Sequence, residues 1–185
     1  MTTAPDVNPA LGRCVEATRA LFGAAAVSIA LVDGAGEALG FVASDGAGAE
    51  EIVGVSIPVS RGIAGWAAMS GQPIAVRDVR SDSRFARDVA EATRYVPTSI
   101  LAAPMLDVDG EVLGVVSVLD PVVDETSDWT LHVLGTIAGL IGGIVTAGSG
   151  PSDGSGEGPE AASLARLGSD VLRLVESWES PGGHR

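Results

Sequence analysis

The sequence predicts an α+β fold in which one antiparallel β-sheet carries helices on one face and short helices and loops on the other. Three observations lead to this prediction. Apolar residues recur at helical spacing near the N-terminus, strand-like segments are joined by tight turns, and a long uncharged segment near residue 140 has the length of a helix. With 185 residues the chain can build one full hydrophobic core but not two.

The first part of the chain alternates between helix and strand signals. Residues 9–22 predict a helix, because Leu11, Val15, Thr18, Leu21 and Phe22 recur at helical spacing. The continuous apolar run over 27–32 predicts a buried strand. We expect a turn over 33–36, a returning strand over 37–44, a loop over 45–51 and a short extended segment over 52–58.

The middle of the chain continues with shorter elements. A short helix is expected over 62–69, ended by Gly71-Gln72-Pro73, and a short strand over 74–76. Residues 83–94 predict a second short helix, with Asp82 or Ser81 capping its start. Strands over 98–106 and 111–119 form a hairpin through Asp109-Gly110, a strong turn signal.

The second hairpin strand is apolar on both faces. One face carries Leu113, Val115 and Leu119, and the other carries Val112, Val116 and Val118. A strand of this kind lies in the middle of a sheet that is covered on both sides.

Ordered motifs connect these elements between Arg61 and Asp120. They are Gly62–Gly65, Ser70–Pro73, Asp78, Arg84–Phe85, Ser99–Pro104 and Gly114–Val118. In this order and spacing the chain resembles the GAF family of small-molecule sensor domains, over roughly residues 8–147. The resemblance implies a ligand pocket between the sheet and the short helices. We therefore expect a stand-alone bacterial GAF protein, with its domain at 9–147 after a disordered segment at 1–8.

Composition narrows the possible partners and the location. The chain has 24 acidic residues against 11 arginines and no lysine, a formal charge of −13. Such a chain repels phosphate backbones and anionic membranes, so we expect no nucleic-acid or membrane partner. The first residues show no signal peptide and Cys14 is the single cysteine, which together favour the cytoplasm.

The apolar segment at 133–149 has two interpretations. It carries no charge, and Gly135, Gly139 and Gly143 repeat at a spacing that permits close helix packing in lipid. However, it has only about the minimum length for a membrane span and lacks flanking basic residues. The favoured interpretation is a helix covered by its own sheet on one side and by a partner helix on the other. We therefore expect a homodimer through the helices at 9–22 and 127–146.

The C-terminal part has a different character. Residues 148–162 are rich in Gly, Ser and Pro, which is typical of a flexible linker, and 181–185 are expected to be a disordered tail. Between them, 163–180 predict an amphipathic helix with an apolar seam of Leu164, Leu167, Val171, Leu174 and Trp178. We expect this seam to dock on a partner, although a fraying tail is an alternative, since so short a helix is marginal in water.

The sequence offers no catalytic constellation. Its two histidines, His132 and His184, and one cysteine cannot form a metal cluster, and no nucleophile or nucleotide motif is present. GAF relatives that reduce methionine sulfoxide, attach bilins, bind haem or bind cyclic nucleotides use cysteine, histidine or lysine residues that this chain lacks at the matching places. We therefore expect no enzyme activity and no haem, bilin or metal, and the cofactor is unknown.

Nine side chains of the pocket region are candidates for ligand contact. They are Trp66, Met69, Asp78, Arg84, Phe85, Arg94, Tyr95, Ser99 and Met105. For Met69 and Phe85 core packing is the preferred interpretation, and Asp78 is expected to bond its own loop. Arg84 pairs with Asp78 or Asp82, or else Arg84 or Arg94 faces an anionic ligand. Two functions remain: a sensor that binds a small molecule and signals to a separate effector through dimer helices or its C-terminal helix, or a dimerising scaffold whose pocket its own side chains fill.

Overall fold

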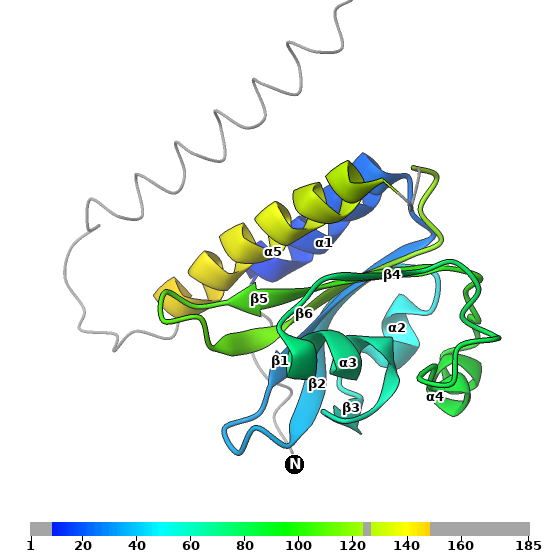
Figure 1. Cartoon of the computed structure of the whole chain (residues 1–185), viewed down its shortest axis with the longest axis horizontal. Coiled ribbons are helices and arrows are strands. Elements are labelled where there is room, and N and C mark those ends of the chain that lie inside the picture. Colours follow the sequence, from blue (N-terminus) through cyan, green and yellow to red (C-terminus); the bar gives the residue numbers. More distant parts are fainter. Residues whose placement is uncertain (1–8, 124–126, 149–185) are drawn as a thin grey trace, which may run out of the picture. The chain divides into compact units, whose positions relative to one another are not determined.

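A computed structural model describes residues 9–123 and 127–148 of the chain. One six-stranded antiparallel sheet has the order β3-β2-β1-β6-β5-β4. Two long helices cover one face, and the short helices lie on the other (Figure 1). The predicted α+β architecture is therefore confirmed. The predicted disordered N-terminus, linker, C-terminal helix and docking seam fall at 1–8 and 149–185, outside the described residues.

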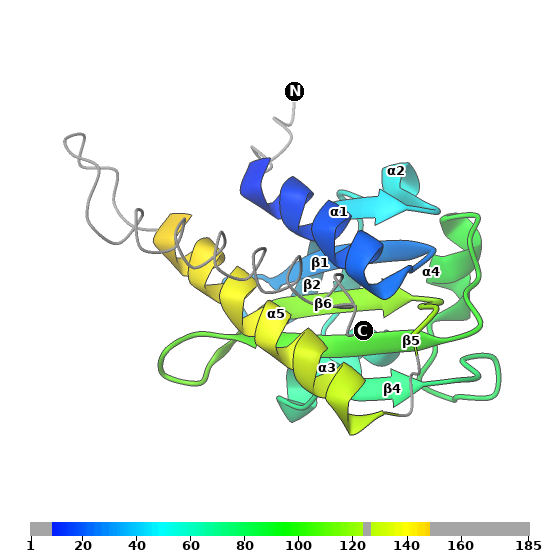
Figure 2. The same ribbon diagram turned by 90° about the horizontal axis from the view of Figure 1, so that it is seen from above.

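The layer of long helices consists of α1, Pro9–Phe22, and α5, Asp128–Gly148. They lie side by side over the sheet, as Figure 2 shows. Of the residues that predicted helix α1, Leu11, Val15, Thr18 and Phe22 are buried, whereas Leu21 is 49% exposed. Helix α5 buries Leu134, Ala138 and Ile141 against the strands and lies mainly over β5 and β6.

The sheet is built from two long antiparallel ladders. Strands β1, Ala26–Val32, and β2, Ala38–Gly46, form one hairpin, and β5, Ile100–Leu106, and β6, Val112–Leu119, form the other. The two hairpins join through β1 and β6, which places β6 inside the sheet as predicted. The turn before Gly110 is held by the Asp107 carboxylate, which accepts hydrogen bonds from two backbone N–H groups, and Gly110 has the positive φ of 85° that this turn requires.

The remaining elements are short and lie at the sheet edges or on the open face. They are α2, Ala49–Ile52; β3, Ser56–Pro58; α3, Gly62–Ser70; β4, Ile74–Val76; and α4, Arg87–Ala92. Helix α2 was predicted as loop, because a single turn is too short to show helical periodicity. Helix α4 is shorter than the predicted 83–94, and neither Asp82 nor Ser81 caps it. The Asp82 carboxylate instead binds Arg84, and the helix ends at Ala92, two residues before Arg94, where φ is +58°.

Two hydrophobic clusters lie on opposite faces of the sheet. The cluster under the long helices contains Val27, Ile29, Val116 and Val118. The cluster on the open face contains Ala30, Val115 and other residues that alternate with the first set. Val112 and Leu113 depart from the expected alternation, because the β5–β6 register shifts at Met105 and Leu106 near the end of the hairpin.

Candidate functional site

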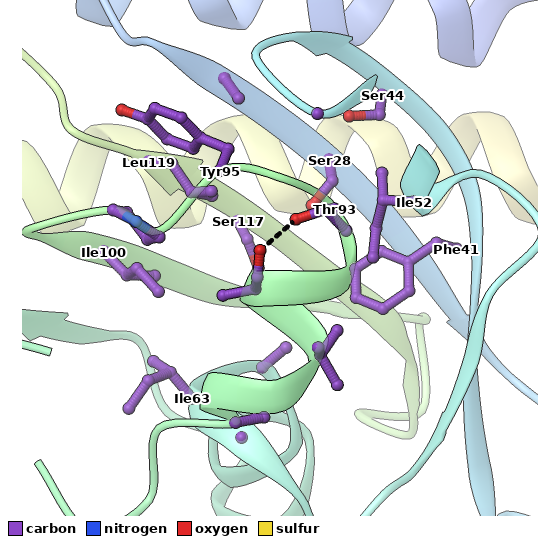
Figure 3. A pocket seen from close by; sticks show the side chains of 18 of the residues that line it. Ser28, Phe41, Ser44, Ile52, Ile63, Thr93, Tyr95, Ile100, Ser117 and Leu119 are labelled. Atoms are coloured by element: carbon purple, nitrogen blue, oxygen red, sulfur yellow. Dashed lines mark hydrogen bonds between the residues drawn. The ribbon is translucent and has the colours of Figure 1, made fainter. Parts of the chain in front are cut away.

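A largely apolar cavity lies between the open face of the sheet and the short helices (Figure 3). Strands β1, β2, β5 and β6 form its floor, and α2, α3 and α4 form its walls. Its volume is about 110 Å³. The larger apolar side chains around it are Phe41, Ile52, Ile57, Ile63, Phe85 and Leu119. The cavity occupies the position in which the family resemblance predicted a ligand pocket.

Three serines form a row across the floor of this cavity. Ser28 of β1 pairs directly with Ser44 of β2 on one side and with Ser117 of β6 on the other. Residues directly opposite each other in antiparallel strands project from the same face of the sheet. All three serines line the cavity. The strand register therefore places three hydroxyl groups side by side under an apolar roof.

The polar side chains of the cavity differ in how their hydrogen bonds are satisfied. The Ser44 hydroxyl donates to the Val27 carbonyl oxygen at 3.0 Å, and the Thr93 hydroxyl donates to the Ala90 carbonyl oxygen at 2.9 Å, the dashed line in Figure 3. Ser28 and Ser117 are 7% and 6% exposed, and neither hydroxyl has a hydrogen-bond partner within 9–123 and 127–148. Both serines are thus buried residues whose hydroxyls are accessible from the cavity and have no partner in the described chain.

Tyr95 closes one side of the cavity through a tight polar contact. Its hydroxyl donates to Asp120 Oδ2 at 2.5 Å. Burial of the phenol, followed by the hydrogen bond to the Asp120 carboxylate and the nearby negative charge, raises the pKa of Tyr95 to about 12. The other carboxylate oxygen of Asp120 accepts the backbone N–H groups of Thr98 and Ser99, both at 2.8 Å. Asp120 thus ties the end of β6 to the segment that follows α4.

No charged side chain lines this cavity among the described residues. Asp120 accepts the Tyr95 hydroxyl but does not itself line the cavity, and neither do Arg61 and Arg84. Arg61 pairs with Asp88 at 2.5 Å on the surface, and Arg84 pairs with Asp82. The cavity therefore offers apolar contacts and hydroxyl groups but no counter-charge.

A second, wider cleft lies beside α3. It has a volume of about 760 Å³ and is bordered by Trp66, Met69, Arg84 and Phe85. The Arg84 guanidinium lies 5.2 Å from the centre of the Trp66 ring and makes a two-point contact with Asp82, at 2.9 and 2.5 Å. The hydrogen bond from Arg84 lowers the pKa of Asp82 to about 2. This cation is therefore already neutralised, as the structural interpretation of Arg84 predicted.

The structure divides the nine predicted ligand residues among different places. Phe85 and Tyr95 line the cavity, and Trp66, Met69 and Arg84 border only the wider cleft. Met69 is 67% exposed, so the preferred interpretation of this residue as core packing was wrong. Helix α3 is apolar on nearly every side, and the pattern therefore does not show which side faces solvent.

Four predicted ligand residues line neither the cavity nor the cleft. Met105 is fully buried under the long helices, because it projects from the opposite side of β5 to Ala102, which belongs to the cluster on the open face. Ser99 is buried beside Asp120, and Arg94 is exposed at its left-handed turn. Asp78 accepts the backbone N–H of Arg80 at 3.2 Å, which confirms its role in its own loop.

The sequence-based candidates did not include the serine row. The sequence does contain a feature that indicates these serines, since Ser28 and Ser117 each interrupt an otherwise apolar strand. A polar residue inside such a run indicates either a local backbone bond or a functional contact. Only the strand register shows that these serines are neighbours.

The single cysteine lies away from this cavity, and the described residues provide no metal site. Cys14 is half-buried on α1 against the cluster under the long helices, so the sheet separates it from the cavity. Burial raises the pKa of its thiol, which disfavours the reactive thiolate. In the described ranges 9–123 and 127–148, no three His, Cys, Asp or Glu side chains are placed to share a metal ion.

Helix α5 leaves one face open. It is long and apolar enough to cross a membrane by length and composition, and its buried residues pack on the sheet. On the other side Trp129 and Leu140 are 61% and 40% exposed, and a side chain added at Gly135, Gly139 or Gly143 would meet no atom within 4 Å. The glycine stripe therefore points away from the sheet.

Comparison with known proteins gives consistent matches. The model of the GAF domain family matches residues 6–145. Among curated proteins, the dual 3',5'-cyclic-AMP and -GMP phosphodiesterase 11A of Takifugu rubripes is 32% identical over 66 residues, which cover 36% of this chain and 7% of the phosphodiesterase. The chain thus corresponds to a small part of that relative.

Solved structures show the same fold. The GAF domain from Acinetobacter phosphoenolpyruvate-protein phosphotransferase superposes with a TM-score of 0.65 at 20% identity, covering 78% of this chain and 85% of that domain. The type II free methionine-R-sulfoxide reductase from Thermoplasma acidophilum superposes with a TM-score of 0.63 at 16% identity, covering 76% and 93%. At these identities the likeness concerns the fold alone.

Proposed function

Because the chain belongs to the GAF domain family, we propose that it is a non-catalytic sensor that binds a small molecule and signals to a separate effector. The observation that carries the proposal is the apolar cavity of about 110 Å³ between the sheet and α2, α3 and α4. A concave apolar site with a few placed polar groups is the usual form of a small-molecule site in proteins. Ser28 and Ser117 supply such polar groups here.

The same strands connect the cavity to the long helices. On β1, Ser28 faces the cavity while Val27 and Ile29 face α1 and α5; on β6, Ser117 lies between Val116 and Val118 in the same way. A ligand that shifts these strands therefore acts directly on residues that support the helices. Packed layers transmit such shifts because protein interiors are close-packed.

The output surface in this proposal is the open face of α5 together with α1. Exposed Trp129 and Leu140 and the glycine stripe form an apolar surface that a second copy of the chain can cover. A homodimer through α1 and α5 would place the two helix layers against each other. Signal would pass by a change in helix packing, or by the C-terminal segment after residue 148.

Absence of catalysis is part of the proposal. The cavity has hydroxyl groups but no histidine, carboxylate or cysteine among its described lining residues, the Tyr95 hydroxyl is bound to Asp120, and Cys14 lies on the opposite face of the sheet. Catalysis in such a site would lack a group to activate a nucleophile or to move a proton.

The proposal is tested by isolating what the protein binds. We expect the purified full-length chain, when denatured, to release a small organic molecule that mass spectrometry detects. Ala90→Trp fills the cavity from α4 and should abolish the release. Ala92→Trp, on an exposed position of the same helix outside the cavity lining, is the matched control and should retain it.

The competing function is a dimerising scaffold without a ligand. It predicts no released molecule from either variant or from the original chain, and no rise in melting temperature with any of a panel of metabolites. If both results are obtained and light scattering shows a dimer, the protein is a scaffold and the sensor proposal is wrong.

A further inference from the structure

We infer that the ligand of this cavity is a neutral molecule about the size of one ring, bearing one hydroxyl or carbonyl oxygen that Ser28 and Ser117 hold together. This inference rests on the proposed sensor function and adds the chemical class of the ligand. Three properties of the cavity carry it: unused hydroxyl groups, the lack of charge, and size.

The unused hydroxyls indicate one oxygen atom at the floor. Ser28 and Ser117 are each more than nine-tenths buried, face the cavity and have no hydrogen-bond partner in the described chain. They are directly opposite on neighbouring antiparallel strands, where Cβ atoms lie about 4.5–5.5 Å apart. Two hydroxyls at this spacing can both reach one ligand oxygen, and each hydroxyl can donate or accept.

The remaining polar side chains reinforce this assignment. Ser44 and Thr93 already donate to backbone carbonyl oxygens, and Tyr95 donates to Asp120. The unused capacity is therefore concentrated at Ser28 and Ser117. A ligand oxygen placed there satisfies both at once, while the rest of the ligand contacts apolar walls.

The lack of charge excludes an ionised ligand. No Arg, His, Asp or Glu among the described residues lines the cavity. An ion that enters an apolar site loses its hydration and needs a counter-charge to replace it. The guanidinium closest in sequence to the lining residue Phe85 belongs to Arg84, which is bound to Asp82 and stacked on Trp66 in the other cleft.

The size of the cavity matches one small ring. An apolar protein cavity of about 150 Å³ is known to take up benzene, and the cavity here measures about 110 Å³. Aromatic side chains form part of its wall: Phe41, Phe85 and Tyr95, which are two of the three phenylalanines and the only tyrosine. A cyclic nucleotide, as named for the phosphodiesterase relative, is both larger than this cavity and anionic.

Phenol, toluene and benzoate are the probes for this inference, because they share a ring and differ in the polar group. Binding to the full chain is measured by ligand-observed NMR and by calorimetry. We expect phenol and toluene to bind and benzoate to be undetectable at the same concentration. In the Ser28→Ala/Ser117→Ala variant, the ratio of phenol to toluene affinity should fall about tenfold, because the hydrogen bonds are lost while the apolar contacts remain.

The controls separate the hydroxyl effect from unfolding. Ser56→Ala changes an exposed serine of β3 outside the cavity lining and should leave the affinity ratio unchanged. If the double variant does not fold, as judged by circular dichroism, Ser117→Ala alone provides the same comparison. Binding of phenol that persists in Ala90→Trp would place the probe elsewhere and overturn the inference.

The remaining outcomes distinguish failure of the inference from failure of the function. Benzoate that binds as well as phenol, or an unchanged affinity ratio in the serine variants, overturns the neutral-ligand class. If no probe binds but denaturation still releases a small molecule, the sensor function stands and the inferred class is wrong. If no probe binds and nothing is released, the cavity holds water only and both proposals fail.

Discussion

The contact between Tyr95 and Asp120 allows a quantitative test of how the rim of the cavity is held. Tyr95→Phe removes only the hydroxyl that donates to Asp120 Oδ2 at 2.5 Å. The pKa of Tyr95 rises from an ordinary value of about 10 to about 12, and two units correspond to about 2.7 kcal/mol. This figure is the free-energy difference between the phenol and the phenolate in the folded protein, and its largest cause is burial, which penalises only the phenolate. The loss at pH 7 is therefore that of one hydrogen bond to a charged group at a partly buried side chain, about 1–2 kcal/mol in the free energy of unfolding.

The pH dependence of this loss has a definite sign. The folded protein holds the phenolic proton more tightly than the unfolded chain, so the stabilisation is complete below pH 10. Between about pH 10 and 12 the unfolded chain loses the proton first, and the stabilisation disappears. Urea unfolding of both proteins, followed by circular dichroism, should show their stabilities converging over this range, because the phenylalanine variant has no proton to lose at this position.

Asp120→Asn is the matched partner for a double-mutant cycle. Asparagine tolerates the left-handed backbone at this position, where φ is +47°, and it still accepts the backbone N–H groups of Thr98 and Ser99. We expect the two substitutions to couple by about 1 kcal/mol. Additivity within about 0.3 kcal/mol at pH 7 would show that the hydroxyl and the carboxylate do not interact, and the reasoning would be refuted.

Four further predictions follow from other parts of the fold. Leu140→Arg, on the open face of α5, should convert a dimer to a monomer in light scattering; a monomer before the change would refute the dimer. Purified protein should not turn over methionine sulfoxide, because Cys14 is alone and on the opposite face from the cavity, and a steady rate after repeated purification would contradict this. Deleting 149–185 should shift the melting temperature by less than about 2 °C but remove binding to any effector recovered by pull-down, whereas unfolding would make that segment part of the core. Gly114→Ala should destabilise by about 3 kcal/mol in urea unfolding, because its Cβ would lie 2.2 Å from the Ala30 carbonyl oxygen; a loss below about 1 kcal/mol would mean that the strands separate easily.

Much of the fold was predictable because strands and long helices show their burial in the sequence. The apolar run ending at Val32, the turn at Gly110 and the helical spacing of Leu11 and Val15 each correspond to an observed element. The short helices were less predictable. Helix α2 has one turn, and the start of α4 depends on whether Asp82 caps the helix or binds the backbone N–H and side chain of Arg84, which spacing alone does not decide.

The candidate site was less predictable than the fold because it depends on register. The sequence motifs predicted charged and aromatic ligand residues such as Arg84 and Trp66, and these two residues lie together in an open cleft. Ser28 and Ser117 belong to different hairpins, and only the β1–β6 pairing makes them neighbours. Met105 shows the same dependence, since a shift of one residue along β5 would have turned it toward the cavity.

The alternation along β1 and β6 has a consequence for how such a sensor changes over time and how it can be redesigned. Cavity-facing Ser28 and Ser117 and helix-facing Ile29 and Val116 occupy successive positions of the same strands. Substitutions at every second position can therefore alter chemical preference while leaving the helix layer untouched, and this makes the floor a natural place for a mutational library. A single inserted or deleted residue has the opposite effect. It exchanges the two sets of side chains, so these strands accept new residue types far more readily than new lengths.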